Sequence, residues 1–228
     1  MPLGEFLRKI YERLYRSFGP QGWWPAETPF EVFVGAILTQ NTAWANVEKA
    51  IDRLKGRGAL EPRRIMEIPE EELQELLRPT GYYRIKAKRL KEAVEFLIGE
   101  FGGSMKRMAR EPLEELRPKL LRIRGIGPET ADSILLYACH KPIFVVDAYT
   151  KRILQRHGLI RGNISYDELQ GLFMDHLPRD VDLFKEYHAL LVRVGKTHCR
   201  PKPKCKGCPL EGLNYEQVVG QEGEEACG

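Results

Sequence analysis

The sequence lacks any long apolar run: none approaches the ~18 residues that a membrane span requires. Its start, MPLGEFLRKIYERLY, alternates charged with apolar residues and has neither the apolar core nor the small-residue cleavage site of a signal peptide. Strand-like alternation is almost missing as well, because only IFVV (143–146) has β character. We therefore expect a cytoplasmic protein built from helices.

A strong charge of either sign is also missing. The 228 residues carry a net charge of +4, with 43% apolar and 30% charged residues. This mildly basic balance permits nucleic acid as a partner without requiring it. The length suffices for one large domain or two small ones, each with its own core.

Cysteines are few and unevenly placed, which argues against a disulfide framework in a cytosolic protein. Of the five, Cys139 lies in an apolar helical stretch, where a buried structural thiol is expected. The other four fall in the last 30 residues: Cys199, Cys205, Cys208 and Cys227. Three thiolates within ten residues indicate metal binding.

Helical periodicity runs through almost the whole chain. The expected helices, roughly ten in number, are 3–17, 29–39, 43–56, 70–78, 84–101, 111–121, 128–139, 148–156, 166–176 and 181–196. Residues 29–39 are apolar on all sides, so this helix should be central. From about residue 211 the chain becomes acidic and glycine-rich, and we expect weak structure there unless Cys227 anchors it.

A glycine turn, Gly125-Ile126-Gly127, separates two expected helices, and Pro128 suits the first position of the second one. The N–H groups at that helix start could bind an anion such as a DNA phosphate, with Arg122 and Arg124 beside them. The alternative is an ordinary turn between packed helices, with Ile126 in the core. The turn alone does not decide between the two.

Asp147 follows IFVV and precedes an expected helix. Taken alone, such an aspartate is a helix N-cap. Trp23, Trp24 and Pro25 stand together, and Trp44 opens the helix after next. The tryptophans could form part of a core, or an aromatic slot for a base swung out of a duplex.

Five motifs, in order, resemble those of the helix-hairpin-helix DNA glycosylases of the endonuclease III superfamily. They are FVGAILTQNTAWANVEKA (33–50), GYYRIKAKRL (81–90), LRIRGIGPETADSIL (121–135), FVVDAYTKRI (144–153) and CRPKPKCKGCPL (199–210). The resemblance covers residues 29–210. It implies an all-α, two-lobed fold, with a six-helix central lobe (21–140) and a lobe formed by both termini (1–20 plus 141–228) that carries a C-terminal iron–sulfur loop.

The resemblance also implies roles for the hairpin and the aspartate. Asp147 would be the catalytic carboxylate, stabilising the cationic sugar or activating water. The hairpin would hold a backbone phosphate of double-stranded DNA, often with a monovalent cation. The residues expected to bind phosphate are Arg122, Arg124, Gly125, Ile126, Gly127, Thr130 and Lys86, although Lys86 could instead face solvent.

Glu129 departs from the pattern of the strand-cleaving members, which carry a lysine nucleophile at this position. A carboxylate cannot form a Schiff base, so the resemblance implies a monofunctional glycosylase. With GWWPA and LTQNTAW, the chain looks most similar to the 3-methyladenine branch. There Trp23, Trp24, Pro25 and Trp44 would line the base pocket, and Gln40 or Asn41 would fill the gap left in the duplex.

The cysteine spacing also departs from the family loop, C-x6-C-x2-C-x5-C. Here Cys199-x5-Cys205-x2-Cys208 is followed by Asn214 at the fourth position. We expect a [4Fe–4S] cluster closed by Cys227. Zinc on the same residues, or with His198 in place of Cys227, is the alternative.

The sequence thus predicts a base excision repair enzyme that hydrolyses the N-glycosidic bond of alkylated purines, with 3-methyladenine the foremost candidate. It would act as a monomer on damaged DNA in the nucleoid. The alternatives are a mismatch or oxidised-pyrimidine glycosylase, and a non-catalytic helix-hairpin-helix DNA-binding protein.

Overall fold

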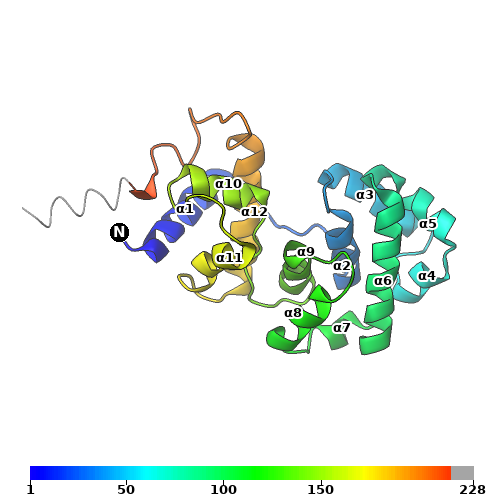
Figure 1. Cartoon of the computed structure of the whole chain (residues 1–228). Coiled ribbons are helices and arrows are strands. Elements are labelled where there is room, and N and C mark those ends of the chain that lie inside the picture. The colour runs from blue at the N-terminus through cyan, green and yellow to red at the C-terminus, as the bar shows by residue number, and fades with distance from the viewer. Residues whose placement is uncertain (217–228) are drawn as a thin grey trace, which may run out of the picture. The chain divides into compact units, whose positions relative to one another are not determined.

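The computed structural model describes residues 1–216, and within them the chain is helical with no strand. It divides into two compact units (Figure 1). The central unit is Trp24–Lys141, and the terminal unit combines Met1–Trp23 with the chain from Pro142 onward. The all-α prediction is confirmed, and the expected boundaries at 20/21 and 140/141 compare with observed ones at 23/24 and 141/142.

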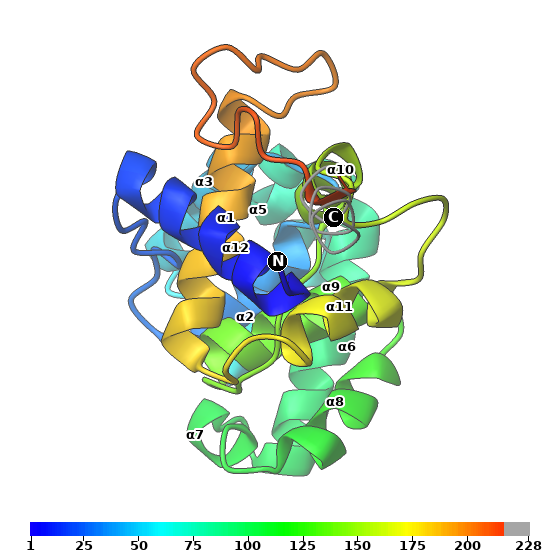
Figure 2. The same ribbon diagram turned by 90° about the vertical axis from the view of Figure 1, so that its left-hand side faces the viewer.

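The terminal unit is formed by α1 (Leu3–Phe18), α10 (Ala148–Arg156), α11 (Tyr166–Met174) and α12 (Val181–Thr197). Figure 2 shows α1 lying against α12, with which it makes many contacts. An aromatic cluster forms the core: Phe144 stacks on Phe173 with ring centroids 3.8 Å apart, and Phe184 and Tyr187 meet Phe144 edge-on. The segment Ile143–Val146 is therefore buried as extended chain without joining a sheet.

The central unit begins with α2 (Pro29–Leu38), which is buried on all sides as expected. Thr28 caps it by accepting a hydrogen bond from the Glu31 amide at 3.1 Å. It packs against α3 (Trp44–Gly56) and the long helix α6 (Tyr83–Phe101), and these two helices contact α5 (Glu70–Leu77) and the 3₁₀ turn η1 (Arg78–Thr80). The hairpin helices are α8 (Leu113–Leu121) and α9 (Pro128–Ser133), the latter continued by the π-helix η2 (Ile134–Ala138).

Two helices of this unit were not predicted: α4 (Pro62–Glu67) and α7 (Met105–Met108). They span six and four residues, which is too short for a repeating apolar pattern to appear. The lobe therefore contains more helices than the six expected.

The start of the acidic tail is also better ordered than expected. Leu213 is buried, Tyr215 packs its ring edge-on against Phe6 at 5.0 Å, and the Tyr215 amide donates to the His157 carbonyl. The prediction of weak structure is wrong for these residues, because their apolar side chains complete the core of the terminal unit. The rest of the tail, 217–228, lies outside the described residues. In residues 1–216 no helix is long and apolar enough to cross a membrane.

Candidate active site and DNA-binding surfaces

Asp147 is the N-cap of α10, as its position before that helix predicted. Its Oδ1 accepts hydrogen bonds from the Thr150 amide at 2.7 Å and from the Thr150 hydroxyl at 2.9 Å. Thr150 itself is fully buried. One carboxylate oxygen is therefore fixed by two donors, while the other is left to interact outside the helix.

That second oxygen faces His188 of α12, whose Nε2 lies 3.7 Å from Oδ2. The two side chains are only 11% and 10% exposed. Burial by itself would raise the pKa of Asp147, but the hydrogen bond and charge of His188 and the two Thr150 donors outweigh it. The net effect holds the pKa of Asp147 below its usual 3.8, so the carboxylate is ionised at neutral pH. The sequence alone gives no reason to assign a role to His188. It lies 41 residues after Asp147, and only the fold brings the two side chains together.

The hairpin turn lies between α8 and α9, and its two glycines serve different purposes. Gly125 has φ +83°, and a Cβ there would lie 2.3 Å from the Arg89 Nε. Gly127 has φ −91°, a value that any residue adopts, and a Cβ there would meet no atom within 4 Å. Only Gly125 is required by the backbone, whereas Gly127 keeps the exposed start of α9 open.

Ile126 between the glycines is buried, at 4% exposure, which agrees with the core role considered for it. Thr130 is also buried, and its hydroxyl accepts a hydrogen bond from Gln40. A buried ion pair ties the two hairpin helices together: Arg117 on α8 donates to both oxygens of the fully buried Asp132 on α9, at 2.8 and 3.1 Å. Glu129, at the position of the family's lysine, is exposed in the first turn of α9.

The two candidates for filling the duplex gap behave differently. The Gln40 amide nitrogen donates to the Gly125 carbonyl at 2.9 Å and to Thr130, and its oxygen accepts from Arg89. Asn41 is exposed and holds a left-handed φ of 52°. Gln40 thus supports the hairpin through hydrogen bonds, whereas Asn41 is exposed to solvent.

Lys86 does not face solvent, and its predicted contact with phosphate is wrong. The side chain is 2% exposed, and Nζ donates to the carbonyls of Leu38 and Thr80, each at 2.8 Å. The sequence left open whether this lysine contacts phosphate or faces solvent, but the carbonyls at the ends of α2 and η1 hold it inside the unit. Burial, with a contribution from the charge of Arg89, lowers the pKa of Lys86 to about 8.

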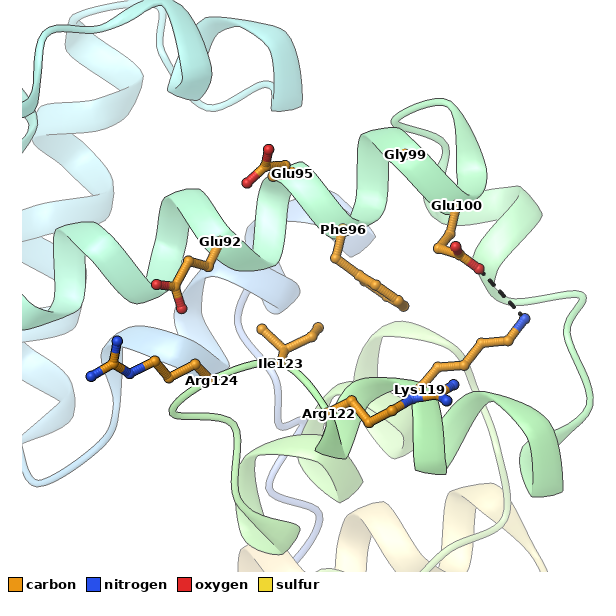
Figure 3. Close-up of a pocket in the computed structure, with 9 residues that line it drawn as sticks. All are labelled: Glu92, Glu95, Phe96, Gly99, Glu100, Lys119, Arg122, Ile123 and Arg124. Atoms are coloured by element: carbon orange, nitrogen blue, oxygen red, sulfur yellow. Dashed lines mark ion pairs between the residues drawn. The ribbon is translucent and has the colours of Figure 1, made fainter.

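Arg122 and Arg124 are exposed, as a role in phosphate binding requires. They border an open groove of about 630 Å³ between α6 and the hairpin (Figure 3). Its other wall carries Glu92, Glu95 and Glu100 of α6, and Lys119 of α8 pairs with Glu100 at 3.7 Å. None of the predicted base-pocket residues lines this groove.

The predicted base-pocket residues of the central unit come together at a different place. The Trp24 ring meets Trp44 edge-on, with centroids 5.2 Å apart, and packs over Gly35 of α2. Tyr137, not predicted, adds a third ring at 5.3 Å from Trp24. Pro25 and Trp44 line a pocket of about 460 Å³. Its charged lining residues are Glu31, Glu48, Lys49, Asp52 and Lys55, of which Lys55 pairs with Glu31 at 3.0 Å. Trp23 ends the N-terminal segment of the terminal unit.

Tyr82 is a further residue that the sequence did not single out. It is 73% exposed and holds φ 48° immediately before α6, and Ile85 one turn later is 51% exposed. A left-handed backbone is unfavourable for a bulky residue, and such strain concentrates at functional sites. The cue in the sequence was the tyrosine pair directly after Gly81, in a connection between helices.

Three of the four candidate metal ligands lie in the described part of the chain. Cys199 is buried, Cys208 half-buried and Cys205 exposed. Burial raises the pKa of Cys208, with further contributions from the other two thiols. Among residues 1–216, however, no group of three or more His, Cys, Asp or Glu side chains could hold a metal ion. The donor chemistry fits a thiolate-bound metal, but the described geometry does not complete a site, and Cys227 lies outside the described residues.

Residues 34–179 match the family model of the HhH-GPD superfamily base excision DNA repair proteins. The chain therefore belongs to this superfamily and is a helix-hairpin-helix DNA glycosylase of base excision repair, as its motifs predicted.

Particular relatives cover nearly the whole chain. A putative DNA repair glycosylase of Methanocaldococcus jannaschii is 49% identical over 209 residues, 91% of this chain and 94% of the relative. The crystal structure of the H. pylori 3-methyladenine DNA glycosylase bound to 1,N6-ethenoadenine has a TM-score of 0.73 and 30% identity, covering 86% of this chain and 98% of that one. A trapped covalent intermediate of endonuclease III with DNA has a TM-score of 0.80 and 25% identity, covering 97% and 100%.

Proposed function

We propose that the protein is a monofunctional DNA glycosylase for alkylated purines, with 3-methyladenine as its foremost substrate. The observation that carries the proposal is the pairing of a fixed, ionised Asp147 with a glutamate at position 129. The first supplies the charge for breaking an N-glycosidic bond. The second cannot act as an amine nucleophile, so the product is an intact strand with an abasic site.

Asp147 acts by electrostatics. As the bond between sugar and base lengthens, positive charge develops on the sugar, and a rigid carboxylate stabilises it without having to reorganise. Oδ2 is the oxygen suited to this role, since Oδ1 is occupied by the two Thr150 donors while Oδ2 faces His188 at 3.7 Å. A base that is already cationic is a good leaving group, so no strong general acid is required.

The aromatic and acidic residues near Trp44 suit a cationic base. Electron-rich indole faces attract a positive purine over a neutral one. The pocket beside Pro25 and Trp44 has three carboxylates against two lysines, Lys49 and Lys55, so its lining carries a small net negative charge. We propose that Trp24, Pro25 and Trp44, together with Trp23, receive the extruded base.

The protein is proposed to bind double-stranded DNA as a monomer. The amides at the open Gly127 end of α9 hold a backbone phosphate, with Arg122 and Arg124 beside them and a monovalent cation at the turn. Asn41 fills the gap left by the extruded base. Tyr82, exposed and apolar on one face, wedges into the stack, as apolar side chains do in proteins that kink DNA.

The C-terminal cysteines are proposed to bind a metal, a [4Fe–4S] cluster through Cys199, Cys205, Cys208 and Cys227 in preference to zinc. The metal would order the loop whose lysines reach DNA and would take no part in the reaction. Iron and zinc analysis with absorbance near 400 nm, on protein prepared without oxygen, tests this. Zinc without iron, or no metal at all, would overturn the cluster.

A panel of duplexes, each with one defined lesion, tests the proposed function. We expect release of 3-methyladenine to exceed release of uracil, mismatched thymine and oxidised pyrimidines, with no strand scission. Efficient trapping of a covalent adduct by borohydride would refute the monofunctional route. Preferential release of thymine or an oxidised pyrimidine would favour the second candidate, an endonuclease III-type activity. The structural similarity to endonuclease III supports this candidate.

A further inference from the structure

Lys86 is the one fully buried charged side chain on α6 in the described chain, and nothing in the proposed chemistry uses it. Its ammonium donates to two backbone carbonyls from different segments, Leu38 and Thr80, at equal distances of 2.8 Å. An apolar side chain such as methionine would fill the same volume without a charge to desolvate. Burial of the charge is unfavourable, as the lowered pKa of about 8 reflects.

The two carbonyls lie where the chain leaves regular structure. Leu38 is the last residue of α2, and Asn41, with its left-handed backbone, follows three residues later. Thr80 ends η1 and is followed by Gly81 and then by left-handed Tyr82. Lys86 therefore connects the starts of two loops, 39–43 and 80–82. Each loop presents an exposed residue with a left-handed backbone, Asn41 or Tyr82.

The same face of α6 reaches the hairpin through a second polar residue. Arg89, three positions after Lys86, donates to the Gln40 side-chain oxygen and passes over Gly125. Gln40 in turn donates to the Gly125 carbonyl and to Thr130. Two adjacent polar side chains of one helix thus connect three loops, namely 39–43, 80–82 and the hairpin turn.

We propose that Lys86 is a positioning residue that holds the 39–43 and 80–82 loops at a fixed spacing, so that Asn41 and Tyr82 enter damaged DNA together. The proposal deepens the proposed function and rests on it. Lys86 touches neither DNA nor base, and it acts through the two carbonyls. A buried cation serves this purpose because one ammonium can bond carbonyls from two directions, whereas methionine can bond neither.

The chain offers a matched control. Lys91, also on α6, donates to the carbonyls of Met66 and Ile68 at the end of α4, at 3.4 and 2.6 Å. Lys91→Met removes the same kind of interaction from the same helix but leaves both loops tied. Lys86→Met removes both hydrogen bonds to the loops. If Lys86→Met fails to fold, Lys86→Gln is the second variant, because it keeps a donor group on a shorter side chain.

The first measurement needs no DNA: amide hydrogen exchange of residues 39–43 and 80–82. Lys86→Met should speed exchange in both loops, while Lys91→Met should change neither. The second measurement is 2-aminopurine fluorescence in a duplex with a stable 3-methyladenine analogue, which reports local unstacking on binding. Lys86→Met should lose most of this signal and lower the kcat for excision roughly tenfold to a hundredfold, with little change in KM.

Unchanged exchange in both loops of Lys86→Met would overturn the proposal. Faster exchange in this variant, combined with wild-type unstacking and wild-type kcat, would overturn it as well. Equal losses in Lys86→Met and Lys91→Met would also overturn it, since they would indicate general destabilisation. Failure of the proposed function is seen separately, in the wild type. If the wild-type protein neither unstacks nor excises the lesion, that function is refuted, whatever the exchange data show. The proposed effect of Lys86 on DNA unstacking is then refuted as well.

Discussion

At the scale of single residues, Asp147 combines two roles that the sequence left as alternatives. It caps α10 through Oδ1, and its Oδ2 faces His188. The capping bonds fix the carboxylate and favour its ionised form, and both effects serve electrostatic catalysis. The structural role is therefore part of what makes the proposed catalytic role effective.

His188 should control the acid limit of activity. Asp147 has a depressed pKa, so its contribution to stability is present above the unfolded value, ~3.9, and is lost as the pH falls through the folded value. His188→Gln removes one of the two main causes of the depression. We expect the acid limb of single-turnover excision to move to higher pH, and the stability lost on acidification to become smaller.

The control for His188→Gln is His176→Gln, at an exposed histidine just after α11 that bonds the Leu172 carbonyl of that helix. This variant should follow the wild-type pH profile. An acid limb that stays in place in His188→Gln would show that His188 does not set the ionisation of Asp147.

At the scale of elements, the hairpin turn should separate stability from DNA binding. Gly125→Ala introduces a Cβ at φ +83° and against Arg89, so we expect a loss of roughly 1–3 kcal/mol in the free energy of unfolding. Gly127→Ala meets no protein atom and needs no unusual φ, so stability should be nearly unchanged. Its methyl group would, however, hinder a phosphate from approaching the α9 amides.

Urea unfolding and binding to a duplex, measured on both variants, check this contrast. Gly127→Ala should bind DNA more weakly at wild-type stability. Wild-type DNA affinity in Gly127→Ala would argue against phosphate binding at this turn and return the hairpin to a purely structural role.

The ion pair between α8 and α9 should hold the hairpin closed. Asp132 is fully buried and Arg117 is 23% exposed, so Asp132→Ala leaves a largely buried guanidinium without this carboxylate. We expect a loss of about 3 kcal/mol in the free energy of unfolding. Glu67→Ala breaks the exposed Arg64–Glu67 pair, whose side chains are both 63% exposed, and should change stability by less than about 0.5 kcal/mol. Equal losses in the two variants would contradict the structural role of the buried pair.

Most helices and their boundaries could be predicted from the sequence, because helix ends depend on local signals. Pro29 and Pro128 mark helix starts, and the apolar faces gave most ends within one or two residues. What could not be predicted depends on tertiary neighbours. Lys86 was misplaced because only the ends of α2 and η1 bury it, and the divergent roles of Gln40 and Asn41 depend on the hairpin beneath them.

At the scale of the whole molecule, the chain builds one unit from its centre and another from both of its ends. Asp147 and His188 belong to the terminal unit, and the hairpin, Trp24 and Trp44 belong to the central one. The proposed catalytic carboxylate and the proposed phosphate-binding hairpin thus belong to units with separate cores. A substitution in one core can therefore be expected to spare the other function, which makes affinity and turnover separable by mutation.

The most direct test of the central claim is base release by Asp147→Asn. Asparagine is itself a good N-cap, so α10 should remain intact. For a duplex with one 3-methyladenine, single-turnover release should fall by about a hundredfold or more relative to the wild type, while the Kd for the same duplex stays within about twofold. Release at the wild-type rate would contradict the account, because the bond would then be broken without the carboxylate on which the proposed mechanism depends.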